Sequence, residues 1–149
     1  MGQITGLVKS SHENARNKGF YEDVDSVLTI LKNVDERLVA VANDAFIAQR
    51  LMLITSELGE GLEGLRYKKR FDKDGCLFDV VGISIIEDDV KFTETFEFHV
   101  KDTVEDELAD AAIRLFDLSG FISCDLESHI LAKARYNSLR AKMHGGKGF

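Results

Sequence analysis

Residues 45–68 read AFIAQRLMLITSELGEGLEGLRYK, and this stretch indicates the fold class more clearly than any other part of the chain. It is so apolar that, as a helix, it would leave little of its circumference for solvent. Asn43-Asp44 lies directly before it and is suited to cap a helix. We therefore expect a long helix from Ala45 to about Lys68. An earlier start is left open, because the apolar pair Leu38-Val39 would allow the helix to run on from there.

Two helices are expected before this stretch. Apolar residues at three- and four-residue steps predict the first, which should extend to about Lys18, where Gly19 stops it. The same spacing predicts the second, with an acidic start at Glu22-Asp23. The chain contains no proline, which also favours helices.

Two helices are expected after it. Thr103 followed by Asp106 resembles a capping box and opens a helix to about Leu118, which Ser119-Gly120 should end. Asp125 is expected to cap a last helix that runs through Met143 and stops at Gly145-Gly146.

The segment from residue 71 to residue 100 has a different pattern. A turn signal at residues 72–75 precedes a β-rich run over residues 77–86, and aromatic residues then fall on alternate positions. We expect a small β-hairpin around residues 77–100, or an excursion between two helices. The fold class is therefore all-α, a helical bundle with this insert.

Size and charge limit the kind of protein. The 149 residues, 44% of them hydrophobic, fit a single domain over 1–149 with its own core. The net charge of -7 argues against a nucleic-acid polymer as partner. No membrane is expected, because charge interrupts the apolar runs. Cys76 and Cys124 lack ligand spacing and are interpreted as reduced thiols of a cytoplasmic protein.

Two acidic pairs lie in the most apolar helix-like stretches. Glu57 and Glu60 are one pair, Glu107 and Asp110 the other, and a three-residue step places each pair on one helix face. Such a pair is usually a solvated surface. Carboxylates that face into a bundle, however, repel one another unless a cation lies between them. Four hard oxygen ligands suit Mg²⁺, with Mn²⁺ as a substitute.

The two pairs also carry a resemblance to a known family. Ser56-Glu57-Leu58-Gly59-Glu60 followed by Glu107-Leu108-Ala109-Asp110 resembles the E-x-x-E and E-x-x-D motifs of the MazG-like nucleoside triphosphate pyrophosphohydrolases. These belong to the all-α NTP pyrophosphatase superfamily. The resemblance extends to Lys18-Gly19-Phe20 and to the tail with Lys133, Arg135-Tyr136-Asn137, Arg140 and His144-Gly145-Gly146-Lys147.

This sequence departs from the family pattern at two places. Many members have a further Glu where Ser56 stands, which puts one outer metal or water contact in doubt. The connection between the two motifs is also longer than in the smallest members, and the insert accounts for the extra length.

The resemblance implies magnesium-dependent hydrolysis of (deoxy)nucleoside triphosphates between the α and β phosphates, giving monophosphate and pyrophosphate. Glu57, Glu60, Glu107 and Asp110 would hold Mg²⁺, and Glu57 or Glu60 would accept the proton of the attacking water. Because the family builds its site from helices of two subunits, a homodimer or a dimer of dimers is implied.

Basic and polar residues at both ends of the chain are candidates for substrate binding. Lys133, Asn137 and Arg140 share one helix face, and family residues at such positions contact phosphate. Taken alone, they would be a solvated basic helix end. Asn14 and Lys18, with Phe20, are expected to line the pocket for the base, although Phe20 would equally suit a core.

Two other classes of protein remain as alternatives. A di-iron carboxylate bundle would need Glu-x-x-His, and neither His99 nor His129 has a Glu three residues earlier. A non-catalytic nucleotide- or metal-binding helical assembly module would keep the fold without turnover.

Overall fold

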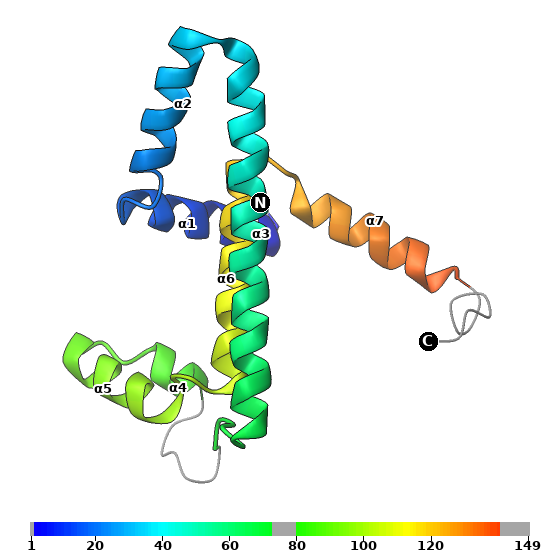
Figure 1. The fold of residues 1–149 in the computed structure, drawn as a ribbon. Coiled ribbons are helices and arrows are strands. Elements are labelled where there is room, and N and C mark those ends of the chain that lie inside the picture. The colour runs from blue at the N-terminus through cyan, green and yellow to red at the C-terminus, as the bar shows by residue number, and fades with distance from the viewer. Residues whose placement is uncertain (1, 73–79, 141–149) are drawn as a thin grey trace.

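The computed structural model describes residues 2–72 and 80–140, and over these ranges the chain forms seven α-helices and no strand (Figure 1). The all-α expectation is therefore confirmed for the described residues. In chain order the helices are α1 Gln3–Asn17, α2 Glu22–Val34, α3 Glu36–Arg66, α4 Val80–Ser84, α5 Asp89–His99, α6 Val104–Phe121 and α7 Leu126–Ser138.

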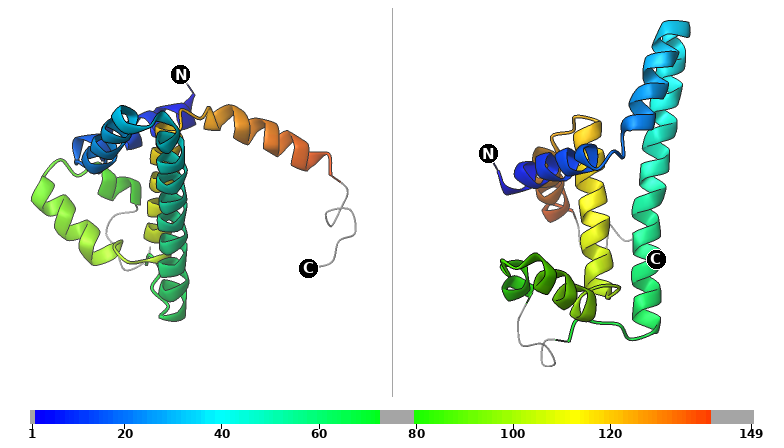
Figure 2. Two further views of the ribbon diagram at one scale, coloured as in Figure 1. Left: turned by 45° about the horizontal axis from the view of Figure 1, so that its top comes forward. Right: turned by 90° about the vertical axis from the view of Figure 1, so that its left-hand side faces the viewer.

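The long helix α3 is the axis of the fold. Helix α6 runs antiparallel along its second half, α2 packs against its first half, and α1 crosses α6 (Figures 1 and 2). Helices α4 and α5 pack on each other beside the start of α6, whereas α7 extends away from the other helices.

Glycines allow α3 and α6 to approach closely. A Cβ atom at Gly61 would lie 3.3 Å from the Cβ of Glu107, and one at Gly64 would lie 3.4 Å from Cγ2 of Val104. Because Gly61 and Gly64 carry no side chain, the α6 side chains occupy that space. The buried residues of α3 are these two glycines and Glu57, so its large apolar residues do not form the core of this chain.

The start of α3 corrects one expectation. The helix begins at Glu36, and the Asp35 side chain caps it by accepting a hydrogen bond from the Arg37 backbone N–H at 2.9 Å. The predicted cap at Asn43-Asp44 is therefore wrong, and the earlier start is correct. Asp44 lies inside the helix, and the Asp35 side chain satisfies one of the free N–H groups of the first turn.

The ends of the later helices are predicted only in part. Thr103 caps α6 and Asp125 caps α7, as expected. The predicted break at Ser119-Gly120 is wrong, since α6 continues to Phe121 and the Cβ of His12 from α1 packs onto Gly120. Helix α7 ends at Ser138, well before Met143, and the expected stop at Gly145-Gly146 lies outside the described residues.

Of the two alternatives expected here, the β-hairpin is not found over residues 80–100, where Val80–Ser84 and Asp89–His99 are the helices α4 and α5. The segment is an excursion between α3 and α6 that is itself helical over these residues, and residues 77–79 lie outside the described part. The Asp88 side chain caps α5 by accepting from the Lys91 backbone N–H at 2.9 Å. The aromatic alternation that suggested a strand also contains a four-residue step, and the Phe92 and Phe96 rings pack on one helix face 5.8 Å apart.

One expectation about apolar runs also needs correction. By length and composition alone, α3 is apolar enough to cross a membrane, with a window of mean hydropathy 1.4. Asp44 and Arg50 are the only charged side chains between Leu38 and Ser56. Buried core helices pass the same test, but none of this window is buried here, so the property shows chiefly that α3 is very apolar.

Candidate metal centre

Three of the four predicted carboxylates come together where α3 and α6 run side by side. One oxygen from each of Glu57, Glu107 and Asp110 lies within 4.8 Å of the others. Glu57 and Glu107 are buried, at 6% and 7% exposure, whereas Asp110 is exposed. Two buried carboxylates and one exposed carboxylate thus form a group that is open on one side.

Helix geometry and the glycine contact produce this group. Glu107 and Asp110 lie one turn apart on α6, so both face α3. Gly61 lies one turn after Glu57 on the same face of α3, and its missing side chain leaves room for Glu107. The antiparallel contact then places Glu57 beside the α6 pair.

This arrangement affects the ionisation of Glu107. Burial, followed by the charges of Glu60 and Glu57, raises the pKa of the Glu107 carboxyl above its ordinary value. Keeping Glu107 ionised at this buried position costs free energy while the neighbouring carboxylates are also charged. A bound cation would remove that cost.

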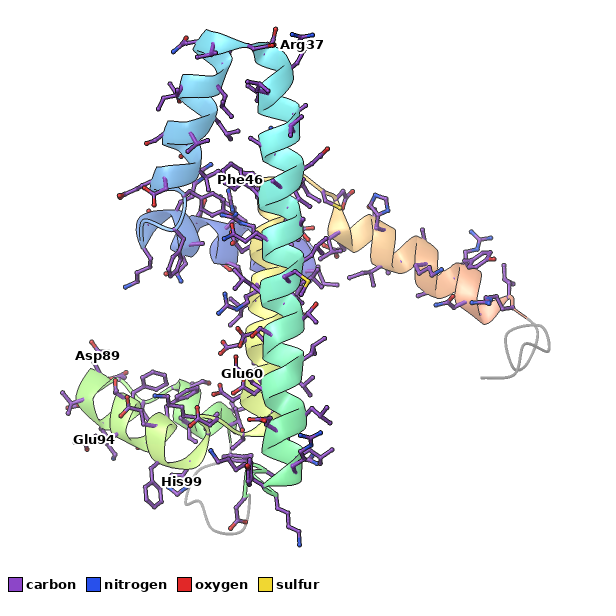
Figure 3. All side chains as sticks on the ribbon, in the orientation of Figure 1. Arg37, Phe46, Glu60, Asp89, Glu94 and His99 are labelled. Carbon is purple, nitrogen blue, oxygen red and sulfur yellow. The ribbon has the colours of Figure 1, made fainter. Side chains whose placement is uncertain are left out.

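Glu60 lies at the edge of the group rather than within it. It is exposed, and Ser56 Oγ donates a hydrogen bond to its Oε1 at 3.3 Å (Glu60 is labelled in Figure 3). Glu60 and Glu107 nevertheless line a common cleft of about 200 Å³ together with Gly64 and Lys69. Glu60 is therefore near enough to affect Glu107, as its effect on the pKa shows.

Arg114 is a site residue that the sequence interpretation missed. Its Nε lies 2.6 Å from Oε1 of Glu57, and its side chain is 44% exposed while that of Glu57 is 8% exposed. The signal was present, since Arg114 is one turn after Asp110 and two turns after Glu107 on the same face of α6. The spacing thus indicates the helix face of Arg114, whereas its pairing with Glu57 depends on how α6 lies against α3.

A larger cleft of about 390 Å³ lies next to this ion pair, between α2, α3 and α6. Arg114 belongs to its lining, which also includes apolar and polar side chains from all three helices and the turn before α2: Phe20, Asp23, Val24, Phe46, Gln49, Arg50, Leu53 and Asp117. Phe46 is labelled in Figure 3. The expected pocket residue Phe20 is thus placed at a cleft, whereas Asn14 and Lys18 are not among the lining residues.

A hydrogen-bonded network supports the far wall of this cleft. Asp117 Oδ1 accepts from the Tyr21 hydroxyl at 2.7 Å and lies 2.8 Å from His12 Nδ1. Arg50 donates from Nε to the same hydroxyl at 3.2 Å, and its guanidinium lies over the Tyr21 ring. Burial and the bond to Asp117 raise the pKa of Tyr21 to about 12. The network holds Asp117 and Arg50, both of which belong to the lining of the cleft.

The predicted phosphate contacts lie on a different part of the molecule. Lys133, Asn137 and Arg140 are all exposed, on α7 or directly after it. Lys133 Nζ lies 5.0 Å from the centre of the Tyr136 ring on the same helix. Because α7 extends away from α3 and α6, the single chain does not bring these residues to the carboxylates (Figures 1 and 2). Residues 144–147 lie outside the described part.

Comparisons with models of protein families, with curated proteins and with solved structures gave no match to this chain. The resemblance seen in the sequence therefore depends on the two acidic motifs, the Lys18-Gly19-Phe20 segment and the basic tail. What the protein does must be inferred from the carboxylate group, Arg114 and the adjoining cleft.

Proposed function

We propose that this chain is a nucleoside triphosphate pyrophosphohydrolase that uses Mg²⁺ to cleave between the α and β phosphates. The observation that carries the proposal is the approach of Glu57, Glu107 and Asp110 to within 4.8 Å, two of them buried. The order of the two acidic motifs along the chain and the adjoining cleft add support.

The donor set fits a hard divalent cation. Carboxylate oxygens from two helices are the ligands that Mg²⁺ and Mn²⁺ prefer. The raised pKa of Glu107 supports the fit, because it reflects negative charge that a cation would compensate. Glu57, Glu107 and Asp110 would hold the ion, with Glu60 close by. A bound divalent ion would acidify water and neutralise phosphate charge.

Other residues of the chain would bind the nucleotide and accept the proton of the attacking water. The cleft at Phe20 offers an aromatic face for a base and lies beside the carboxylate group, so a nucleotide bound there would direct its phosphates toward Glu57. Glu60, exposed and at the edge of the group, is suited to accept the proton of the attacking water. Its bond from Ser56 would hold it in place.

The same proposal includes a second copy of the chain. The accessible surface is 11366 Å², against roughly 7,600 Å² for a compact protein of this size. Leu58, Leu62 and Leu65 on α3 are each more than half exposed. Helix α7 has 13 residues and little packing, which is marginal for a helix in water. A homodimer, or a dimer of dimers, would cover α3 and bring the basic α7 of one subunit to the acidic group of the other.

The test is release of pyrophosphate from a panel of canonical and deoxynucleoside triphosphates with Mg²⁺. Release from at least one, lost in Asp110→Asn and Glu60→Gln, is the expected result. Near-normal release in either variant would contradict the metal and base assignments. Binding of Mg²⁺ without release from any nucleotide would instead favour the alternative, a non-catalytic binding module.

A further inference from the structure

The ion pair between Arg114 and Glu57 lies at the boundary between two parts of the site. Along α3, the cleft residues Phe46, Arg50 and Leu53 come first, then Glu57, then Glu60. Arg114 is the residue of α6 that both lines the cleft and contacts a member of the carboxylate group. Arg114 therefore lies between the cleft, which has space for a substrate, and the carboxylates, which would bind a metal.

We propose that Arg114 is a phosphate-binding residue that competes with the metal for Glu57: Glu57 exchanges the guanidinium for the cation, and the released guanidinium binds a phosphate in the cleft. This inference rests on the proposed function. It adds a residue and an order of events that the acidic motifs do not contain.

The contact itself favours such an exchange. With Nε of Arg114 at 2.6 Å from its Oε1, Glu57 has part of its coordinating capacity engaged. A divalent ion brought to the same carboxylate would repel the guanidinium, and at a few Å this repulsion is comparable to the strength of the pair. Glu57 is 8% exposed and Arg114 is 44% exposed, so Arg114 is the partner with room to move.

The surroundings of Arg114 determine where it goes. The side chain already borders a cleft of about 390 Å³, large enough to admit part of a nucleotide. Its planar group has donors that match phosphate oxygens two at a time, which a lysine cannot reproduce. Arg50 lines the same cleft but is hydrogen-bonded to Tyr21. A metal that bound Glu57 would therefore displace Arg114 and not Arg50.

The test measures binding without turnover, using Mn²⁺ alone and then inorganic tripolyphosphate in saturating Mn²⁺, by calorimetry. Arg114→Ala should bind Mn²⁺ about tenfold more tightly than the unchanged chain, because a competing positive charge is gone. It should bind tripolyphosphate about tenfold more weakly or worse. The affinity of Arg114→Lys for tripolyphosphate should lie between that of Arg114→Ala and that of the unchanged chain, since lysine keeps the charge and loses the paired donors.

Arg70→Ala is the matched control. Arg70 forms a pair of the same length, with its Nε 2.6 Å from Oε1 of Glu105, but Glu105 is not among the three grouped carboxylates. Both affinities should stay within about twofold of the unchanged chain. Arg114→Gln, which keeps a similar length without charge, replaces Arg114→Ala if that variant does not fold.

The outcomes separate this inference from the proposed function. Weaker Mn²⁺ binding in Arg114→Ala would mean that Arg114 merely positions Glu57, and would overturn the exchange. Unchanged tripolyphosphate binding would overturn the role in phosphate binding. If the unchanged chain does not bind Mn²⁺ at all, the proposed function and this inference are both overturned. If it binds Mn²⁺ but Arg114→Ala changes neither affinity, this inference alone is overturned.

Discussion

Gly61 of α3 lies directly against Glu107 of α6, so closely that a Cβ atom on the glycine would come within 3.3 Å of the Glu107 Cβ. The contact brings a buried carboxylate of one helix to the carboxylate of the other. A residue that carries no chemistry of its own therefore determines whether the group can form. Its neighbours on the same face are Glu57, one turn before, and Gly64, one turn after.

Substituting Gly61→Val should separate the helices and weaken the carboxylate group. A branched side chain has no space against Glu107, and overpacking of this kind costs about 1–3 kcal/mol. Chemical denaturation should show that loss, and calorimetry should show Mn²⁺ binding weakened by about tenfold or more. Gly6→Ala is the control: a Cβ atom there would meet nothing within 4 Å beyond the adjoining helix backbone, so it should gain up to about 1 kcal/mol from helix propensity. Normal Mn²⁺ affinity in Gly61→Val would show that the glycine contact does not shape the group.

The stability of the metal-free protein should depend on the ionisation of Glu107. Its pKa in the folded state is raised above the ordinary 4.5, so the folded protein holds this proton more tightly than the unfolded chain. The stabilising contribution is complete below pH 4.5 and is lost as the pH rises through the raised value. At pH above that window and in EDTA, Glu107→Gln should be more stable than the unchanged chain by on the order of 1 kcal/mol.

Thermal melting across the pH range in EDTA measures this difference. It should shrink as the pH falls toward the ordinary range of a glutamate, and Mg²⁺ should stabilise the unchanged chain more than the variant. Glu94→Gln on the exposed side of α5 is the control and should show no such trend. A difference that is constant with pH would contradict the raised pKa.

Tyr21 should ionise only at high pH and should contribute measurably to the free energy of unfolding. Its pKa is raised from 10.0 to about 12, chiefly by burial and then by the hydrogen bond to Asp117. A raised pKa means that the contribution is complete below pH 10 and is lost as the pH approaches 12. In ultraviolet titration, the spectrum of the unchanged chain minus that of Tyr21→Phe should show one tyrosinate forming near pH 12.

The same variant should be less stable by about 1–2 kcal/mol at neutral pH, because Asp117 loses the donor at 2.7 Å. Tyr67→Phe, at an exposed position, should stay within about 0.5 kcal/mol of the unchanged chain. Equal stability losses in the two variants would show that the Asp117 bond adds nothing.

Local sequence signals predicted the helices well where a side chain caps the N-terminus of its own helix. Thr103 and Asp125 cap helices as their spacing predicts, because each N-cap bond spans only four consecutive residues. Ser119-Gly120 looked like a break, but Gly120 is used for the approach of His12 from α1, and a glycine alone does not tell the two apart. The α5 segment contains both a two-residue and a four-residue aromatic repeat, so its period was ambiguous.

The candidate site was predictable to a smaller degree. The helical step relates Glu107 to Asp110, and the apolar context suggested burial, which the structure gives for Glu57 and Glu107. The pairing of Arg114 with Glu57 depends on how α6 lies against α3, and no local pattern contains that information. The same holds for α7, whose basic face can be read from the sequence but whose position cannot.

The position of α7 leads to the sharpest test of a shared site. If the basic residues of one subunit serve the carboxylates of the other, a variant lacking one set should be complemented by a variant lacking the other set. We expect Asp110→Asn and the double variant Lys133→Ala, Arg140→Ala to be inactive in pyrophosphate release when each is assayed alone. Mixed, unfolded and refolded together, they should recover about a quarter of normal release, because half the dimers are mixed and each mixed dimer has one complete site.

A site built within one chain gives the opposite outcome, since every chain in the mixture then carries a defect in its own site. Leu62→Glu on the exposed face of α3 provides the control for assembly. A charge at that position should yield monomers in sedimentation analysis, and introduced into both partners it should abolish the recovery. Phe98 of α5 is 83% exposed, more than Leu62, and Phe98→Glu should leave both assembly and recovery intact, because α5 extends away from α3 (Figure 1).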